Sequence, residues 1–434
     1  MSFSSFEVAQ TPNSRLSTTE SHDYDLMIVG GGIVGLTLAA ALKNSGLTVL
    51  LVEAQVTSTA VAKGQAYAIH MLSARIFQGI GIWEKILPHI AKYRQVFLSD
   101  AEYPNVVKFQ TSDLGRETSE LGYVAEHFAL LEPLQQFVKT CANVNYLCPA
   151  TVVSTQTTGD MVNVNIRVNG ADQVVRTKLI VAADGSKSPI RQAAGIKTKG
   201  WKYWQSCIVA FVRPEKSHNY TAYEKFWQSG PFAILPLPGN RCRIVWTAPH
   251  EEAKTLCALS DQEFLAELTR RYGHQMGKLE LLGDRFIFQV QLMQSDRYVL
   301  PRLALVGDAA HNCHPVGGQG LNLGIRDAAA LAEVIQTAHH EGKDIGTIQI
   351  LQQYERWRKN ENLAILGFTD LLDRMFSNNI LPMVIIRRLG LWLMQRIPML
   401  KLFALKLMIG FQGRTPQLAQ STVNTNFHGL NNQL

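Results

Sequence analysis

Residues 24–35 read YDLMIVGGGIVG, and this stretch decides the fold class. Tyr24–Val29 is an apolar run with the length of a buried strand, and the glycine-rich turn after it leads into an Ala/Leu-rich helix over Ile33–Lys43. A second buried strand follows at Thr48–Val52. A strand, a turn, a helix and a strand in this order predict the start of a parallel sheet that helices cover on both faces.

The glycines of the turn, together with the acid after the second strand, indicate a dinucleotide site. Gly30 permits a tight turn, Gly32 lets the backbone approach a pyrophosphate at the positive helix N-terminus, and Gly35 lets the helix pack closely on the strand. Glu53 ends the second strand, where a carboxylate accepts hydrogen bonds from a ribose diol. Because Glu53 disfavours a 2′-phosphate, we expect NAD or FAD rather than NADP. A purely structural turn is the alternative.

Two further strand ends carry polar residues. Leu179–Ala182 is followed by Asp184-Gly185, which could equally be a turn capped by the Asp side chain. Leu303–Val306 is followed by Asp308, whose carboxylate can bind a polyol hydroxyl or merely cap the strand. The next loop feeds a helix start at Gly320-Leu321. Its free N–H groups and positive partial charge suit a ring that becomes anionic when reduced.

Four motifs therefore stand in order: GGGIVG at 30–35, DGSKSPIR at 184–191, GDAAH at 307–311 and HPVGGQGLNLGIRD at 314–327. Together they resemble the FAD-dependent aromatic hydroxylases of the para-hydroxybenzoate hydroxylase fold, and the last motif resembles the ubiquinone-biosynthesis hydroxylases. The resemblance runs from about Tyr24 to Gly410. It implies an α/β chain, α+β overall, with a Rossmann-like FAD-binding domain, an interleaved β-sheet substrate domain and a C-terminal helical segment.

The resemblance also implies the site residues. The implied cofactor-binding residues are Gly30, Gly32, Ile33, Val34, Gly35, Glu53, Asp184, Arg191, Gly307, Asp308, Gly318, Gly320, Leu321 and Asn322. The implied catalytic residues are His314, Pro315 and Gln319, with His314 and Pro315 at the flavin face. One position departs from the family, because relatives usually carry Arg where Gln65 stands, and Arg75 is the candidate substitute.

We expect the chain to be organised around that discontinuous FAD-binding domain. Residues 65–95 look mostly helical, a long helix is predicted over about 321–337, and helices broken at Pro382 and Pro398 follow from Ile348 onward. The predicted parts are a disordered leader (1–22), the FAD-binding domain (23–95, 120–200 and 290–345), the substrate domain (96–119 and 201–289), C-terminal helices (346–415) and a disordered tail (416–434).

The charge is distributed unevenly. The 434 residues are 46% hydrophobic and carry a net charge of +7, but Arg374–Leu434 holds seven Lys or Arg and no Asp or Glu. The body is therefore neutral, which argues against a nucleic-acid protein. Two amphipathic helices in 380–414 either pack on the body with solvated cations or lie on an anionic membrane surface. We expect membrane contact, and a cytoplasmic, peripherally membrane-associated protein, since no secretory signal is recognisable.

The predicted activity is FAD-dependent hydroxylation of the aromatic ring of a prenylated phenol or quinone precursor, of ubiquinone or plastoquinone type, with NADH or NADPH and O₂. A quinone-biosynthesis complex is a possible partner. The alternatives are a flavin monooxygenase of another aromatic or isoprenoid substrate and a non-catalytic FAD-fold scaffold of such a complex. No metal is predicted, although His311, Cys313 and His314 lie close together. A phenolate-stabilising base is expected in the substrate domain, with Tyr203, Tyr223 and His250 as candidates.

Overall fold

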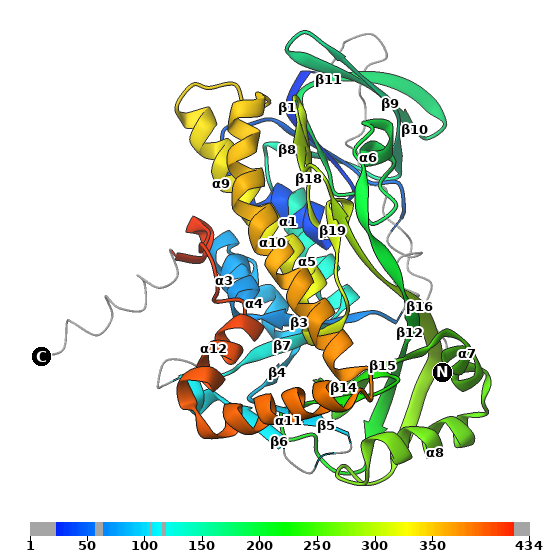
Figure 1. The fold of residues 1–434 in the computed structure, drawn as a ribbon. Helices are drawn as coiled ribbons and strands as arrows, with labels where there is room; N and C mark the ends of the chain where they lie inside the picture. Colours follow the sequence, from blue (N-terminus) through cyan, green and yellow to red (C-terminus); the bar gives the residue numbers. More distant parts are fainter. Residues whose placement is uncertain (1–22, 57–63, 102, 104–105, 115–118, 421–434) are drawn as a thin grey trace, which may run out of the picture.

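The computed structural model describes residues 23–56, 64–101, 103, 106–114 and 119–420. The predicted disordered leader, 1–22, lies outside the described residues, as does 421–434 of the predicted tail. The tail residues that are described are ordered: 417–420 form a helical turn, and Ala419 is fully buried in the core of the first sheet. The described chain forms two eight-stranded sheets, a three-stranded sheet and a group of C-terminal helices (Figure 1).

The first sheet confirms the predicted strand–turn–helix–strand unit. Its main path contains β17 (Val299–Leu300), β18 (Leu303–Leu305), β11 (Ala171–Ala182), β1 (Asp23–Val29), β2 (Val49–Val52) and β8 (Val144–Leu147) in that order. All of these except β17 are parallel to their neighbours on the path. Helix α1 (Ile33–Ala41) packs between α5 (His127–Lys139) and α9 (Gln319–His340). The chain therefore has the mixed α/β, Rossmann-like architecture that the turn predicts. The antiparallel strands β9 (Ala150–Thr158) and β10 (Met161–Val168) extend the sheet beside the first half of β11.

Residues 65–95 are only partly helical. Helices α3 (Met71–Ile80) and α4 (Trp83–Ile86) are flanked by β3 (Ala66–His70) and β4 (Ala91–Tyr93). Both strands pair with β7 (Gly122–Glu126) to form the three-stranded sheet. The helical prediction is wrong for these short strands because their partner lies far away in the sequence.

The second sheet carries the predicted substrate-domain segments. Its order is β19 (His311–Asn312), β16 (Leu279–Ser295), β12 (Thr198–Pro214), β15 (Arg241–Pro249), β14 (Gly230–Leu237), β13 (Thr221–Trp227), β5 (Gln95–Asp100) and β6 (Val106–Gln110). Helices α7 (His250–Ala258) and α8 (Asp261–Tyr272) pack on it. Strands β12 and β16 form a long antiparallel pair that reaches from the second sheet toward the first (Figure 1). The predicted domain boundaries at 200/201 and 289/290 fall inside these continuous strands.

Three helices complete the chain. Helix α10 (Ile348–Phe376) packs along α9, α11 (Leu381–Arg396) contacts β6, and α12 (Pro398–Met408) contacts the short turn Thr111–Leu114 (Figure 1). Pro382 and Pro398 lie in the first turns of α11 and α12, so the predicted breaks are confirmed. Among the helices of the described chain, none combines the length and apolar character needed to cross a bilayer.

The cations of the C-terminal segment are mostly paired with carboxylates. Arg387 is the most buried of them, and its Nε donates to Asp100 Oδ2 at 2.9 Å. The other pairs are Arg374–Asp370, Arg388–Asp100, Lys401–Asp113 and Arg414–Glu333. Five of the seven cations are therefore paired with four acids that lie before Arg374 in the chain, because Arg387 and Arg388 share Asp100. Arg396 stacks over Trp392, and neither it nor Lys406 forms an ion pair among the described residues.

Candidate active site

The polar motifs meet at one edge of the first sheet. Val29, at the end of β1, is paired in register with Val52 of β2 and with Ala182 of β11. Ala182 is in turn paired with Leu305 of β18. Because these strands are parallel, the segments that follow them emerge side by side. The carboxyl edge of such a sheet is where open α/β folds bind ligands.

The first turn leaves space at one glycine and none at the others. Gly30 has a φ of +111°, and a Cβ there would lie 2.4 Å from the Ala183 carbonyl oxygen. A Cβ on Gly35 would lie 1.9 Å from the Gly30 carbonyl oxygen, whereas a Cβ on Gly32 would meet no atom within 4 Å. Gly30 and Gly35 are therefore needed for chain packing. Gly32 borders open space at the N-terminus of α1, where no side chain caps the free N–H groups.

Glu53 holds this turn in place. Its Oε2 accepts a hydrogen bond from the Gly31 N–H at 2.6 Å, and its Oε1 accepts one from the Gln55 N–H at 2.6 Å. The carboxylate therefore ties the end of β2 to the turn after β1.

Arg191 is a buried clamp between two of the strand-end segments. Its guanidinium donates to the carbonyl oxygens of Ala309 and Ser186, each at 2.8 Å. Asp184, at the start of the same motif, is largely enclosed, and burial raises the pKa of its carboxyl group. Its Oδ1 has no hydrogen-bond partner among the described residues. Arg191 thus braces the loop, while Asp184 retains an unused acceptor.

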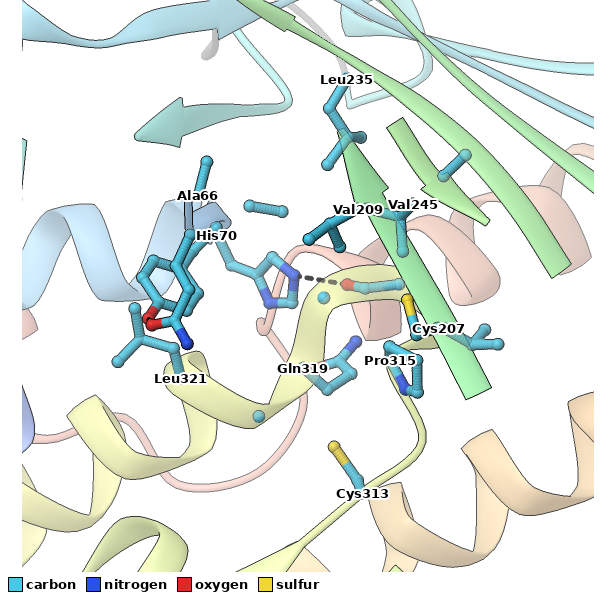
Figure 2. Close-up of a pocket in the computed structure, with 18 of the residues that line it drawn as sticks. Ala66, His70, Cys207, Val209, Leu235, Val245, Cys313, Pro315, Gln319 and Leu321 are labelled. Carbon is cyan, nitrogen blue, oxygen red and sulfur yellow. Dashed lines mark hydrogen bonds between the residues drawn. The ribbon is translucent and has the colours of Figure 1, made fainter. Parts of the chain in front are cut away.

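A cavity of about 660 Å³ joins the turn after β1 to the second sheet. Figure 2 shows its middle, where Pro315, Gln319 and Leu321 lie across from Cys207, Val209 and Val245 of the second sheet. The predicted site residues that line it are Gly32, Ile33, Val34, Asp308, Pro315, Gly318, Gln319, Gly320 and Leu321. The predicted site residues outside its lining are Gly30, Gly35, Glu53, Asp184, Arg191, Gly307, His314 and Asn322.

The loop before α9 is held open by its glycines and by one amide side chain. Gly317 and Gly318 have φ values of +66° and +61°, a left-handed conformation that favours glycine. Asn322 Nδ2 donates to the carbonyl oxygens of Ala68 and Gly318, and its Oδ1 accepts from the His70 N–H at 2.9 Å. The N-terminus of α9 has no side-chain cap and opens onto the cavity. The Asn322 side chain therefore shapes the loop and does not face the cavity.

His314 supports the loop from behind. Its side chain is fully buried, and its Nε2 lies 3.4 Å from Gln205 Oε1 and 3.6 Å from Asp373 Oδ1. Its Nδ1 accepts the Val316 N–H, so the proton of the neutral ring sits on Nε2. Burial lowers the pKa of His314 to about 3. The structure thus places Pro315, rather than the His314 imidazole, at the cavity.

Comparison with known proteins places the chain in a family. The sequence model of the FAD binding domain family matches residues 23–366. The chain belongs to the FAD-dependent hydroxylases. It is an FAD-binding monooxygenase, so the family that its four motifs resemble is confirmed.

Its relatives span nearly the whole chain. It is 49% identical to the uncharacterized protein slr1300 of Synechocystis, with 92% of this chain and 96% of that protein covered. It is 37% identical to ubiquinone hydroxylase UbiL of Rhodospirillum rubrum, with 87% and 88% covered. The crystal structure of p-nitrophenol 4-monooxygenase PnpA from Pseudomonas putida matches with a TM-score of 0.74 at 18% identity, covering 91% of this chain and 99% of that one. This last likeness concerns the fold alone.

The cavity of this hydroxylase fits FAD. Two helix N-termini, those of α1 and α9, open onto one cavity without a side-chain cap. Such ends attract negative charge, which FAD carries on its pyrophosphate and, when reduced, on its ring. Asp308 lines the same cavity, and desolvation raises the pKa of its carboxyl group. The space over Gly32 leaves room for close backbone approach.

The hydroxylase also holds a cavity cation that the sequence did not reveal. Arg243 of β15 is buried, lines the cavity and donates from Nη1 to the Ala66 carbonyl oxygen, beside Gln65. Its Nε has no partner among the described residues, and burial lowers its pKa. Arg75 instead stacks on Phe411 and does not line the cavity, so the expected substitution by Arg75 is not seen.

The three candidate bases of the substrate domain lie away from the cavity. Tyr203 donates to Asp370 Oδ1 at 2.6 Å, Tyr223 packs edge-on against other rings, and His250 bonds the Ser206 hydroxyl. The cavity is instead lined by Glu224, the residue after Tyr223. Because side chains alternate between the two faces of a strand, Tyr223 and Glu224 must point to opposite sides of β13. This alternation was the sequence signal that could have favoured Glu224 over Tyr223.

Proposed function

We propose that this hydroxylase uses NADH or NADPH and O₂ to hydroxylate the aromatic ring of a prenylated precursor of a ubiquinone- or plastoquinone-type quinone. The observation that carries the proposal is that one cavity connects the two uncapped helix ends with an apolar region. We call this region, which is lined by Tyr93, Val96, Leu121, Leu405, Met408 and Ile409, the chamber. The names of two relatives, ubiquinone hydroxylase UbiL and the 3-demethoxyubiquinol 3-hydroxylase of Escherichia coli, support the substrate class.

In this proposal, the first sheet holds the cofactor. The N-terminus of α1, with Gly32, Ile33 and Val34, holds the pyrophosphate, and Asp308 accepts hydrogen bonds from the polyol chain. Gly320 and Leu321 offer backbone N–H groups to the ring. FAD, when bound, supplies hydride acceptance and oxygen activation. Pro315 and Gln319 border the part of the cavity where the substrate ring would lie.

The far wall of the chamber is apolar and suits a prenyl chain. It is built from the second and third sheets together with α12, through Tyr93, Val96, Leu121, Leu405, Met408 and Ile409. A long isoprenoid side chain needs an apolar path, because leaving it in water costs free energy in proportion to its area. Leu405 and Met408 of α12 belong to this wall, so we expect the prenyl chain to lie against α12.

The outer surface of α11 and α12 is the proposed membrane contact. It exposes large apolar side chains, namely Leu381, Ile385, Ile386, Leu389, Met399 and Phe403. An exposed apolar surface of this kind needs a cover, and a lipid surface is the cover that also holds a prenylated substrate. Because most nearby cations are already paired, apolar insertion would drive this contact more than charge. The peripheral location and any quinone-biosynthesis complex belong to the same proposal.

Profiling a deletion strain tests the function. Loss of the gene should deplete a lipid quinone and accumulate a precursor that lacks one ring hydroxyl. Purified enzyme with FAD, NADH or NADPH, and O₂ should then hydroxylate that precursor. An unchanged quinone profile, together with no product from prenylated phenols, would contradict the proposed substrate class while leaving the family assignment intact.

A further inference from the structure

One carboxylate lies in the apolar chamber. Side chains alternate along β13, so Ala222, Glu224 and Phe226 share the face that turns toward the cavity. Ala222 and Phe226 are buried in the apolar cluster that also holds Val96 and Leu405. Glu224 is half-buried because its carboxylate faces the open cavity. Among the described residues that line the cavity, Glu224 and Asp308 are the two carboxylates, and they belong to different sheets.

Glu224 is placed beside the loop that precedes α9. The Gly317 N–H interacts with its carboxylate, and the Gly317 carbonyl oxygen accepts a hydrogen bond from His70 Nε2 at 3.0 Å (Figure 2). Burial lowers the pKa of His70 to about 4, so this imidazole is neutral and donates its Nε2 proton. Gly317 therefore links Glu224 to the end of β3 and to the loop that carries Pro315.

Among the residues that the structure describes, no cation pairs with this carboxylate. The ion pairs of the described residues do not include Glu224, and burial raises its pKa to about 7. Burying a carboxylate without a charged partner is unfavourable, and such groups concentrate at functional sites. Tyr93, the titratable group beside it, is kept protonated because burial and the charge of Glu224 raise its pKa. Glu224 is thus an acceptor that the fold leaves for something entering the chamber.

We propose that Glu224 accepts a hydrogen bond from the ring hydroxyl of the phenolic substrate and takes its proton. This inference rests on the proposed function. The phenol O–H bond breaks and a carboxyl O–H bond forms, while the electron pair stays on the phenolate oxygen. That pair raises the electron density of the ring carbons and favours electrophilic oxygen transfer to them. The proton returns from Glu224 to the same oxygen of the hydroxylated product.

The test compares two ligands in two variants of the FAD-loaded, full-length enzyme. The ligands are a prenylated phenol and its methyl ether, which has the same shape but no hydroxyl proton. Binding is followed by quenching of protein fluorescence. The variants are Glu224→Gln, which keeps the side-chain volume, and the matched control Glu280→Gln, whose carboxylate pairs with Arg213 on an exposed edge of the second sheet.

A hydrogen bond to a charged acceptor predicts that the phenol binds about tenfold or more weakly to Glu224→Gln than to the wild type. The methyl ether should bind both alike, and Glu280→Gln should behave as wild type with either ligand. Unchanged FAD absorbance would show that the variant is folded and loaded. Equal losses for phenol and ether, or no loss for the phenol, would overturn the role of Glu224. A wild-type enzyme that binds neither ligand would overturn the proposed substrate class as well.

Discussion

The proposed membrane face can be tested by removing two of its side chains. Met399 is 82% exposed and Phe403 is 57% exposed, and they lie four residues apart on the same face of α12. Leu405, which faces the inside, is fully buried. The double substitution Met399→Gln and Phe403→Gln therefore removes outward apolar area while leaving the packing of α12 and the cavity wall in place. Gln also preserves helix propensity.

The expected loss follows from the exposed area. A Phe side chain has roughly 200 Å² of surface, and somewhat over half of that surface is exposed at Phe403. Transferring this exposed area into lipid would contribute about 2–3 kcal/mol at ~25 cal/mol per Å². Met399 contributes a similar amount, about 2 kcal/mol. Full insertion of both predicts about 10³-fold weaker vesicle binding, and half insertion predicts roughly thirtyfold. Within the described part of the chain, Arg396 and Lys406 are the two C-terminal cations without an ion pair, so anionic lipid should add only about 2 kcal/mol, or roughly thirtyfold.

Co-sedimentation with liposomes of neutral and of mixed neutral and anionic lipid measures both quantities. The matched control is Val153→Gln with Val174→Gln, two exposed valines on strands β9 and β11, at the opposite end of the molecule from α12 (Figure 1). This control should bind vesicles as the wild type does. The reasoning fails if the α12 variant binds equally well. It also fails if the wild type ignores neutral vesicles and gains more than about 10³-fold from anionic lipid, since charge would then drive the contact.

Three further predictions concern the cavity. Gly35→Ala should abolish folded protein in a soluble-expression and circular-dichroism assay, because its Cβ would lie 1.9 Å from the Gly30 carbonyl oxygen. Gly32→Ala should fold normally, because its Cβ meets no atom within 4 Å, but it should bind FAD about tenfold or more weakly. Asp308→Ala should lower FAD affinity about tenfold or more in a fluorescence titration with unchanged circular dichroism, and full retention of flavin would refute its role. The preference for phenol over methyl ether should rise with pH through about 7, where Glu224 loses its proton, and should be flat in Glu224→Gln.

The first sheet could be predicted closely because its signals are local. The strand, turn and helix of residues 23–41 depend on consecutive residues, and their observed ends differ from the predicted ends by a residue or two. Strands β3 and β4 could not be predicted in this way, because each is stabilised by pairing with β7, tens of residues away. The length of β12 and β16 was hidden for a similar reason. Their mutual pairing carries both strands past the points where composition suggested a domain boundary.

The same difference between local and long-range signals decides which site residues could be predicted. Positions where glycine is required by close packing, such as Gly30 and Gly35, are visible in a motif, because the motif records the packing itself. The direction of a side chain is not recorded there. His314 lies next to Pro315 in the sequence, yet its ring turns away from the cavity toward Asp373. Glu224 has no motif at all, and only the strand order of the second sheet brings it to the chamber.

The acid-free C-terminal segment shows that a count of cations does not reveal which of them are paired with carboxylates. Its seven cations suggested an electrostatic docking surface, but a charge attracts a membrane only where no carboxylate neutralises it. Arg387 is buried against Asp100 of β5 and also donates to the carbonyl oxygens at the end of α10. This side chain therefore fixes α11 to the substrate sheet. Because α11 leads directly into α12, the same anchoring holds Leu405 at the cavity and leaves Phe403 outside. Ion pairs therefore fix the position of α11 and α12, and the exposed apolar side chains of these two helices would contact a bilayer.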